Sequence, residues 1–195
     1  MVLDLIGEPG MEPVVGMLYS MVDGNYKRLK TIVAGMSQEE LDYKGPNQKY
    51  NSTAQLVRHL AYVDLKWIFR IKGEAVPREL EEKFGPSFDK NDQLPQLKGI
   101  SLDVLMTDYD HVVQMIKSMC YQLTDKQLHQ TVEDENGYKA TIQWGIWHIA
   151  DHNRYHQAHI NQLRKWFSQK SETREDQHHE KRDFTIGGGN LSLGR

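Results

Sequence analysis

Hydrophobic residues recur at intervals of three and four positions along four stretches of the chain, and this spacing predicts four amphipathic helices. The first covers residues 12–34, and the second covers residues 51–73. The third covers residues 101–123, and the fourth begins near Thr141 and continues past Trp166. Helices of this kind bury their apolar faces against one another, so we expect an all-α protein built as a four-helix bundle.

The segments between the helices carry turn and loop signals. Residues 37–40 form a capping-box pattern typical of a short helical turn, and the Asn136-Gly137 pair predicts a small hairpin before the last helix. Residues 74–100, with three prolines and mixed charges, are expected to form a long crossover on the surface. From about Ser168 onward the composition becomes strongly polar, which favours a disordered segment. We therefore expect a bundle domain at residues 1–168 and a flexible C-terminal tail at residues 169–195.

Composition narrows the class of protein. The single cysteine, Cys120, excludes an intramolecular disulfide and a cysteine-rich zinc site. The formal charge is −3 and no run of lysine or arginine forms a basic patch, which argues against a nucleic-acid-binding protein. No apolar stretch approaches the roughly 20 residues of a membrane span, and the N-terminus does not resemble a signal peptide. We therefore expect a cytoplasmic protein without nucleic-acid or membrane partners.

Four histidines stand at spacings of four, four and three residues on the fourth predicted helix: His148, His152, His156 and His159. On an α-helix these positions fall within an arc of about 80°, so the imidazoles share one face. Neutral imidazole is a common metal ligand, and two rings one turn apart can hold a single cation. The spacing alone allows three chelating pairs, namely His148 with His152, His152 with His156, and His156 with His159.

Two ligands hold a metal poorly, and catalytic zinc sites typically have three protein ligands and one open position. The best candidate for the third ligand is His59, which lies beside the apolar stripe of the second predicted helix. His111 on the third helix is the second choice, and His129 in a polar linker is the third. The alternative is that these histidines bind no metal and only hydrogen bond to one another or to water.

Two known metal motifs fit poorly. His148, Asp151 and His152 resemble the inverted zinc-protease pattern H-x-x-E-H, but aspartate replaces the glutamate and no downstream carboxylate ligand follows. A di-iron bundle needs two Glu-x-x-His motifs, and the chain offers only Asp108 three residues before His111. Neither a zinc protease nor a di-iron protein is expected.

Two segments resemble signatures of the DinB-like superfamily, which includes YfiT-type metal hydrolases and the bacillithiol and mycothiol S-transferases. The first is NSTAQLVRHLA at residues 51–61, a capped helix start that leads through an apolar run into a histidine. The second is HNRYHQAHI at residues 152–160, a His-x-x-x-His pair on the last long helix. The resemblance covers roughly residues 10–168 and implies a bundle of the DinB/YfiT-like type.

The resemblance implies a ligand set and a range of activities. It assigns His59, His152 and His156 as ligands of a divalent metal, with zinc or nickel favoured and iron or manganese as alternatives. It implies a metal-dependent thiol S-transferase or a hydrolase acting on a small molecule, with a low-molecular-weight thiol as a partner, and it is compatible with a homodimer. The chain has Gln157-Ala158-His159 where many members have Arg-Gly-Gln, which leaves the substrate open. The alternative function is a non-catalytic metal-binding or structural bundle with a role in stress.

Overall fold

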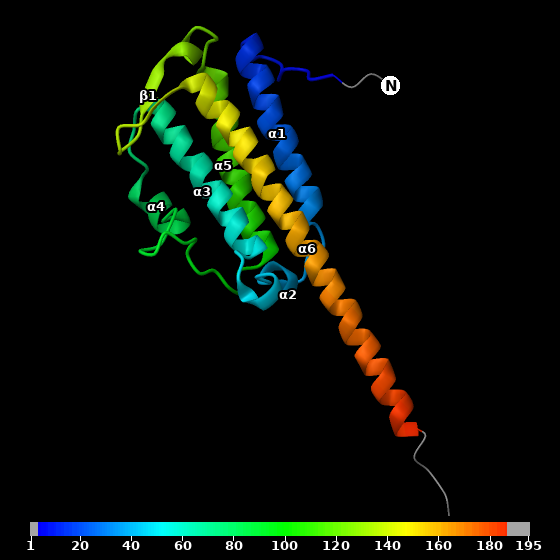
Figure 1. Ribbon diagram of the computed structural model, residues 1–195. Coiled ribbons are helices and arrows are strands. Elements are labelled where there is room, and N and C mark those ends of the chain that lie inside the picture. Colours follow the sequence, from blue (N-terminus) through cyan, green and yellow to red (C-terminus); the bar gives the residue numbers. More distant parts are fainter. Residues whose placement is uncertain (1–3, 187–195) are drawn as a thin grey trace, which may run out of the picture.

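Four long helices form the body of the protein (Figure 1), and their bounds are α1 (Pro13–Val33), α3 (Thr53–Lys72), α5 (Leu102–Gln122) and α6 (Ile142–Ile186). The computed structural model describes the backbone of residues 4–186 and the side chains of residues 4–170. Helix α6 contacts α1 and α3, and α5 contacts the same two helices, so the four helices enclose one core. The predicted all-α four-helix bundle is confirmed.

Polar side chains fix where the long helices begin. Ser52 and Gln55 form a reciprocal capping box at the start of α3, and Ser101 accepts a hydrogen bond at the start of α5. Helix α1 has no cap from its own flanking residue. Its backbone N–H groups at Val14 and Val15 instead donate to the carboxylate of Asp125, at 3.0 Å each. The N-terminus of α1 is therefore capped from a loop more than 100 positions away.

Aliphatic side chains from the long helices fill the core. Leu60, Ile116 and Ile149 are each fully buried, and burying a side chain of this size stabilises the fold by about 1.5–3 kcal/mol. Helix α6 lies against α3 at Gly145, where an added Cβ atom would lie 2.7 Å from the Trp67 ring. A larger residue at this position would push the two helices apart, one turn before the histidine face of α6.

Short elements occupy the connections, and they are α2 (Gln38–Leu41), η1 (Pro46–Gln48), α4 (Arg78–Phe84), η2 (Gln127–His129), β1 (Thr131–Glu133) and β2 (Lys139–Thr141). The two strands pair in antiparallel fashion around Gly137, which has a positive φ of 82°. This confirms the predicted hairpin. The crossover at residues 74–100 contains α4, a helix that the sequence pattern did not predict.

The crossover is tied to the first half of α3. The side-chain amide of Gln55 donates to the carbonyl oxygens of Leu94 and Pro95, at 3.1 and 2.9 Å. The guanidinium of Arg58 donates to three further carbonyls, at residues 83–85. These bonds satisfy polar groups of a segment that has little secondary structure of its own. They also hold the crossover beside the histidine face of α3 and α6.

Helix α6 extends beyond the bundle (Figure 1) and ends at Ile186. The last helix is therefore longer than the sequence pattern indicated, because residues 169–186 continue it. Glutamate, glutamine, lysine and arginine dominate this stretch, and they are good helix formers even without a core to pack against. Residues 187–195 of the predicted tail lie outside the described residues, and its mobility stays a prediction. No helix in the described part of the chain combines the length and the apolar character needed to cross a membrane.

Candidate metal centre

Three histidines from two helices converge between α3 and α6, and we refer to His59, His152 and His156 as the three-histidine cluster. One ring nitrogen from each lies within 4.8 Å of the others. The Nε2 atoms of His152 and His156 are 3.0 Å apart. Their ring centroids lie 5.1 and 5.2 Å from that of His59. The structure thus brings together the three residues that the sequence predicted as ligands.

The donor set of this cluster suits a divalent metal ion. Two imidazole nitrogens that bind one cation at about 2.0–2.1 Å each are about 3.0–3.4 Å apart, and the Nε2 pair of His152 and His156 already has that separation. No carboxylate or thiol joins the cluster among the described residues. The cluster is therefore compatible with a divalent cation held by three neutral nitrogen ligands.

Burial keeps these rings neutral. It lowers the pKa of His156 to about 3 and that of His152 to about 4, with a further lowering from the neighbouring histidines. Burial also lowers the pKa of His59, and a hydrogen bond with the Ser87 backbone acts in the opposite direction. A neutral ring keeps one nitrogen lone pair free. At neutral pH all three side chains are thus in the protonation state that binds metal.

The remaining histidines of the predicted ladder flank the cluster. His148 stacks on His152, with ring centroids 5.5 Å apart, and on its other side it stacks on Trp144. Nδ1 of His159 lies 3.4 Å from Nδ1 of His156, on the edge of that ring opposite to Nε2. Neither residue belongs to the cluster, so of the three pairs allowed by spacing only His152 with His156 forms part of a group of three possible ligands among the described residues.

The other sequence candidates lie elsewhere. His111 is exposed on α5 and His129 is exposed in η2, and neither joins the cluster. Asp64 is buried on α3 and hydrogen bonds with Tyr109, away from the ligand face. This agrees with its position five residues beyond His59, which places it about 140° around the helix.

A hollow of about 660 Å³ opens onto the three-histidine cluster. Its walls come from the loop before α3, the crossover and α6, and they include the aromatic side chains of Tyr50, Phe88, Tyr155 and Trp166. Tyr50, Phe88 and Tyr155 are each at least half exposed. The sequence pattern gave no sign of Tyr50 or Phe88, because both lie in loops where no periodicity marks a common face. Their role depends on how the loops fold back over α3.

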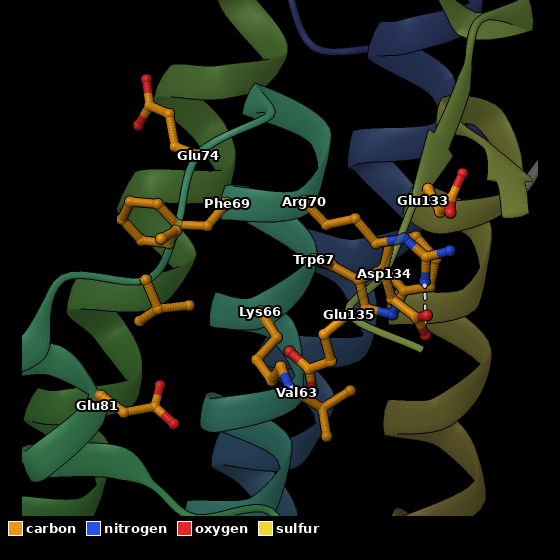
Figure 2. Close-up of a pocket in the computed structure, with 12 residues that line it drawn as sticks. Val63, Lys66, Trp67, Phe69, Arg70, Glu74, Glu81, Glu133, Asp134 and Glu135 are labelled. Atoms are coloured by element: carbon orange, nitrogen blue, oxygen red, sulfur yellow. Dashed lines mark hydrogen bonds and ion pairs between the residues drawn. The ribbon is translucent and has the colours of Figure 1, made fainter. Parts of the chain in front are cut away.

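A second hollow, of about 530 Å³, lies near the other end of α3 and the hairpin (Figure 2). Two of its basic side chains, both on α3, pair with two acidic side chains that follow β1. Arg70 lies 3.8 Å from Asp134, and Lys66 lies 2.5 Å from Glu135. These pairs fasten the hairpin to α3, and no histidine lines this hollow. The metal-ligand chemistry is therefore concentrated at the first hollow.

Comparisons with known proteins give a consistent result. The family model for the DinB superfamily matches residues 21–160. An uncharacterized protein, YkkA, from Bacillus subtilis (strain 168) is 47% identical over 167 residues, which cover 85% of this chain and 95% of that protein. A solved structure of a conserved protein from Enterococcus faecalis has the same fold, with a TM-score of 0.58 and 18% identity, over 78% of this chain and 97% of that one.

Proposed function

The chain belongs to the DinB superfamily, and on that basis we propose that it is a metal-dependent enzyme with the three-histidine cluster as its metal centre. The observation that carries the proposal is the hollow in front of the cluster, since it leaves one side of the ligand set accessible to a small molecule. A structural metal site is normally closed by four protein ligands, whereas a catalytic site keeps a position open. We favour zinc or nickel as the metal, because imidazole suits both.

Three neutral ligands would leave a divalent cation with its full charge, so that it would lower the pKa of a bound water or thiol. The supporting role of the chain is to hold His59, His152 and His156 neutral and facing one another. Phe88 packs near His59, with ring centroids 5.6 Å apart, and Tyr155 packs near His156, with ring centroids 5.1 Å apart. These two rings border the cluster with apolar surface, which would bind the apolar part of a substrate and exclude water.

The leading reaction is transfer of a low-molecular-weight thiol. The thiol sulfur forms a bond to an electrophilic carbon, the leaving group departs with its electron pair, and the thiol proton passes to solvent. The hollow is lined by two lysines and one aspartate, namely Lys44, Lys49 and Asp92. Their positive net charge favours a substrate with an anionic group. Hydrolysis of a small molecule is the second reaction that such a site could support.

The test compares both reactions in one preparation. Protein purified without a polyhistidine tag is assayed for conjugation of cysteine, glutathione and bacillithiol to chlorodinitrobenzene, and for hydrolysis of nitrophenyl esters. We expect conjugation that disappears after chelation, returns with zinc or nickel, and is lost in His59→Ala but kept in His111→Ala. Hydrolysis with the same metal dependence would assign the second reaction. A protein that binds stoichiometric metal and has neither activity would support the non-catalytic alternative.

A further inference from the structure

A chain of buried polar side chains crosses the centre of the bundle. The hydroxyl of Tyr109 on α5 donates to Oδ2 of Asp64 on α3, and it accepts a hydrogen bond from Nδ2 of Asn153 on α6, both at 2.7 Å. Oδ1 of Asn153 accepts from Nε2 of Gln157, at 2.7 Å. The Gln157 amide also donates to the backbone carbonyl of Asn25 on α1, again at 2.7 Å. The four side chains are each at most 2% exposed, and the chain links all four long helices.

Two members of this chain are immediate neighbours of the predicted ligands. Asn153 follows His152, and Gln157 follows His156. Consecutive helix residues point about 100° apart. Helix α6 therefore presents one stripe to Tyr109 at the bundle centre and an adjacent stripe to His59 on α3. The rotation of α6 about its axis sets both directions at once.

Apolar packing alone fixes this rotation weakly, because hydrophobic contacts have no preferred direction. Hydrogen bonds between buried groups do have one, and a small rotation that stretches them leaves polar atoms unpaired away from water. The network leaves Oδ1 of Asp64 and Oε1 of Gln157 without a partner, but on rotation of α6 it would also lose the bonds that join Asn153 to Tyr109 and Gln157 to Asn25. It can therefore select one rotation of α6 from several that would bury similar apolar area.

We propose that the hydrogen-bond chain of Asp64, Tyr109, Asn153 and Gln157 sets the rotation of α6 and so directs His152 and His156 toward His59. Tyr109, Asn153 and Gln157 are then positioning residues for the metal centre, although none of them touches the metal or the substrate. Their relevance to metal binding rests on the proposed function. The geometric part of the proposal, the approach of the histidine rings, does not depend on it.

The first test is zinc binding by Tyr109→Phe, with Tyr26→Phe as a matched control. Tyr26 is also buried, and its ring centroid lies 5.0 Å from that of Tyr109. Its hydroxyl, however, donates to Asp110, which is not a member of the hydrogen-bond chain. We expect a weakening of zinc affinity of about tenfold or more in Tyr109→Phe, the range found when indirect partners of metal ligands are removed. The Tyr26→Phe variant should keep the wild-type affinity. Equal affinity in the two variants would overturn the proposal.

The second test needs no metal. Nuclear Overhauser contacts between the ring protons of His59 and His156 are measured in the metal-free protein. We expect them in the wild type and in Tyr26→Phe, and we expect them to be lost in Tyr109→Phe. If the wild type binds no zinc and this pattern holds, the proposed function fails and the positioning role stands. If the contacts persist in Tyr109→Phe, the positioning role is wrong whatever the metal result.

A third variant keeps the proposal testable if Tyr109→Phe does not fold. Gln157→Met preserves the length of the side chain and removes both hydrogen bonds that the amide donates. We expect the same weakening of zinc affinity and the same loss of ring contacts, with helical circular dichroism unchanged. A folded Gln157→Met protein with wild-type affinity and wild-type ring contacts would overturn the proposal.

Discussion

Nε2 of His152 lies 3.0 Å from Nε2 of His156 across one turn of α6. Both rings are neutral at pH 7, because burial lowers their pKa values to about 4 and about 3. Two lone-pair donors are thus held at the separation that a shared cation requires. His59 from α3 completes a set of three without any carboxylate to reduce the charge of a bound metal.

The first prediction concerns the pH dependence of metal binding. Protons compete with a metal only when the pH approaches the pKa of the free ligand. For a ligand with an ordinary pKa near 6.5, the neutral fraction would fall about fivefold between about pH 6.5 and about pH 5.5. The lowered pKa values of His152 and His156 predict a zinc affinity that stays nearly constant over this range. Competition titrations with a zinc indicator at several pH values measure it, and a steep fall beginning near pH 6.5 would contradict the prediction.

The second prediction concerns acid stability of the metal-free protein. The pKa of His156 is lower in the folded protein than in the unfolded chain, so the unfolded state takes up protons first as the pH falls. The folded protein should therefore lose stability below about pH 6.5, by on the order of 1–2 kcal/mol at pH 5 from this residue. Urea unfolding of the wild type and His156→Gln at about pH 6.5 and at pH 5 measures how much stability each protein loses. The prediction is wrong if the two proteins show the same loss.

The third prediction concerns the effect of Asp64 on stability, which changes with pH in the opposite direction to that of His156. Burial raises the pKa of Asp64 to about 8, above its ordinary value, so the folded state holds a proton that the unfolded chain has released. Stability is therefore lost as the pH rises from about 4 toward 8, by about 1 kcal/mol between pH 7 and pH 8. In Asp64→Asn this loss should disappear, while an acceptor for the Tyr109 hydroxyl remains. Urea unfolding of the wild type and Asp64→Asn at pH 6.5 and pH 8 tests it, since the histidines contribute equally in both proteins, and the same change in stability with pH in the two would contradict the prediction.

The fourth prediction concerns the cap of α1. Removing the carboxylate of Asp125 leaves the N–H groups of Val14 and Val15 without their partner. We expect Asp125→Ala to lower the free energy of unfolding by about 1–2 kcal/mol. The exposed Asp103→Ala variant serves as the control and should lose less than half as much. Metal affinity should be unchanged in both, because neither residue lines the hollow or belongs to the three-histidine cluster, and a change in Asp125→Ala alone would contradict the assigned role.

Local signals in the sequence were sufficient for the main elements. Apolar residues at helical spacing predicted three long helices to within about two residues, a normal margin for helix ends, and Ser52 and Ser101 cap two of these helices in the structure. The resemblance to the DinB-like signatures selected His59, His152 and His156 as ligands, a choice that helical spacing alone left open. Both kinds of signal lie within short segments, and for that reason they can be interpreted without a structure.

Other features depend on contacts between distant segments, and the sequence did not predict them. Asp125 caps α1 because the loop after α5 lies against the start of the chain's first helix. Tyr50 and Phe88 reach the hollow only because the loops fold over α3. Tyr109 is buried on α5, and its hydroxyl contacts depend on the positions of Asp64 and Asn153 on two other helices.

The most direct test of the metal centre is the metal content of tag-free protein and its variants. Protein purified without a polyhistidine tag is analysed by mass spectrometry of its metals, together with His59→Ala and the exposed-histidine control His111→Ala. We predict one divalent metal per chain in the wild type and in His111→Ala, and loss of that metal in His59→Ala. Wild-type protein without stoichiometric metal, or His59→Ala that retains all of it, would contradict a metal centre formed by His59, His152 and His156.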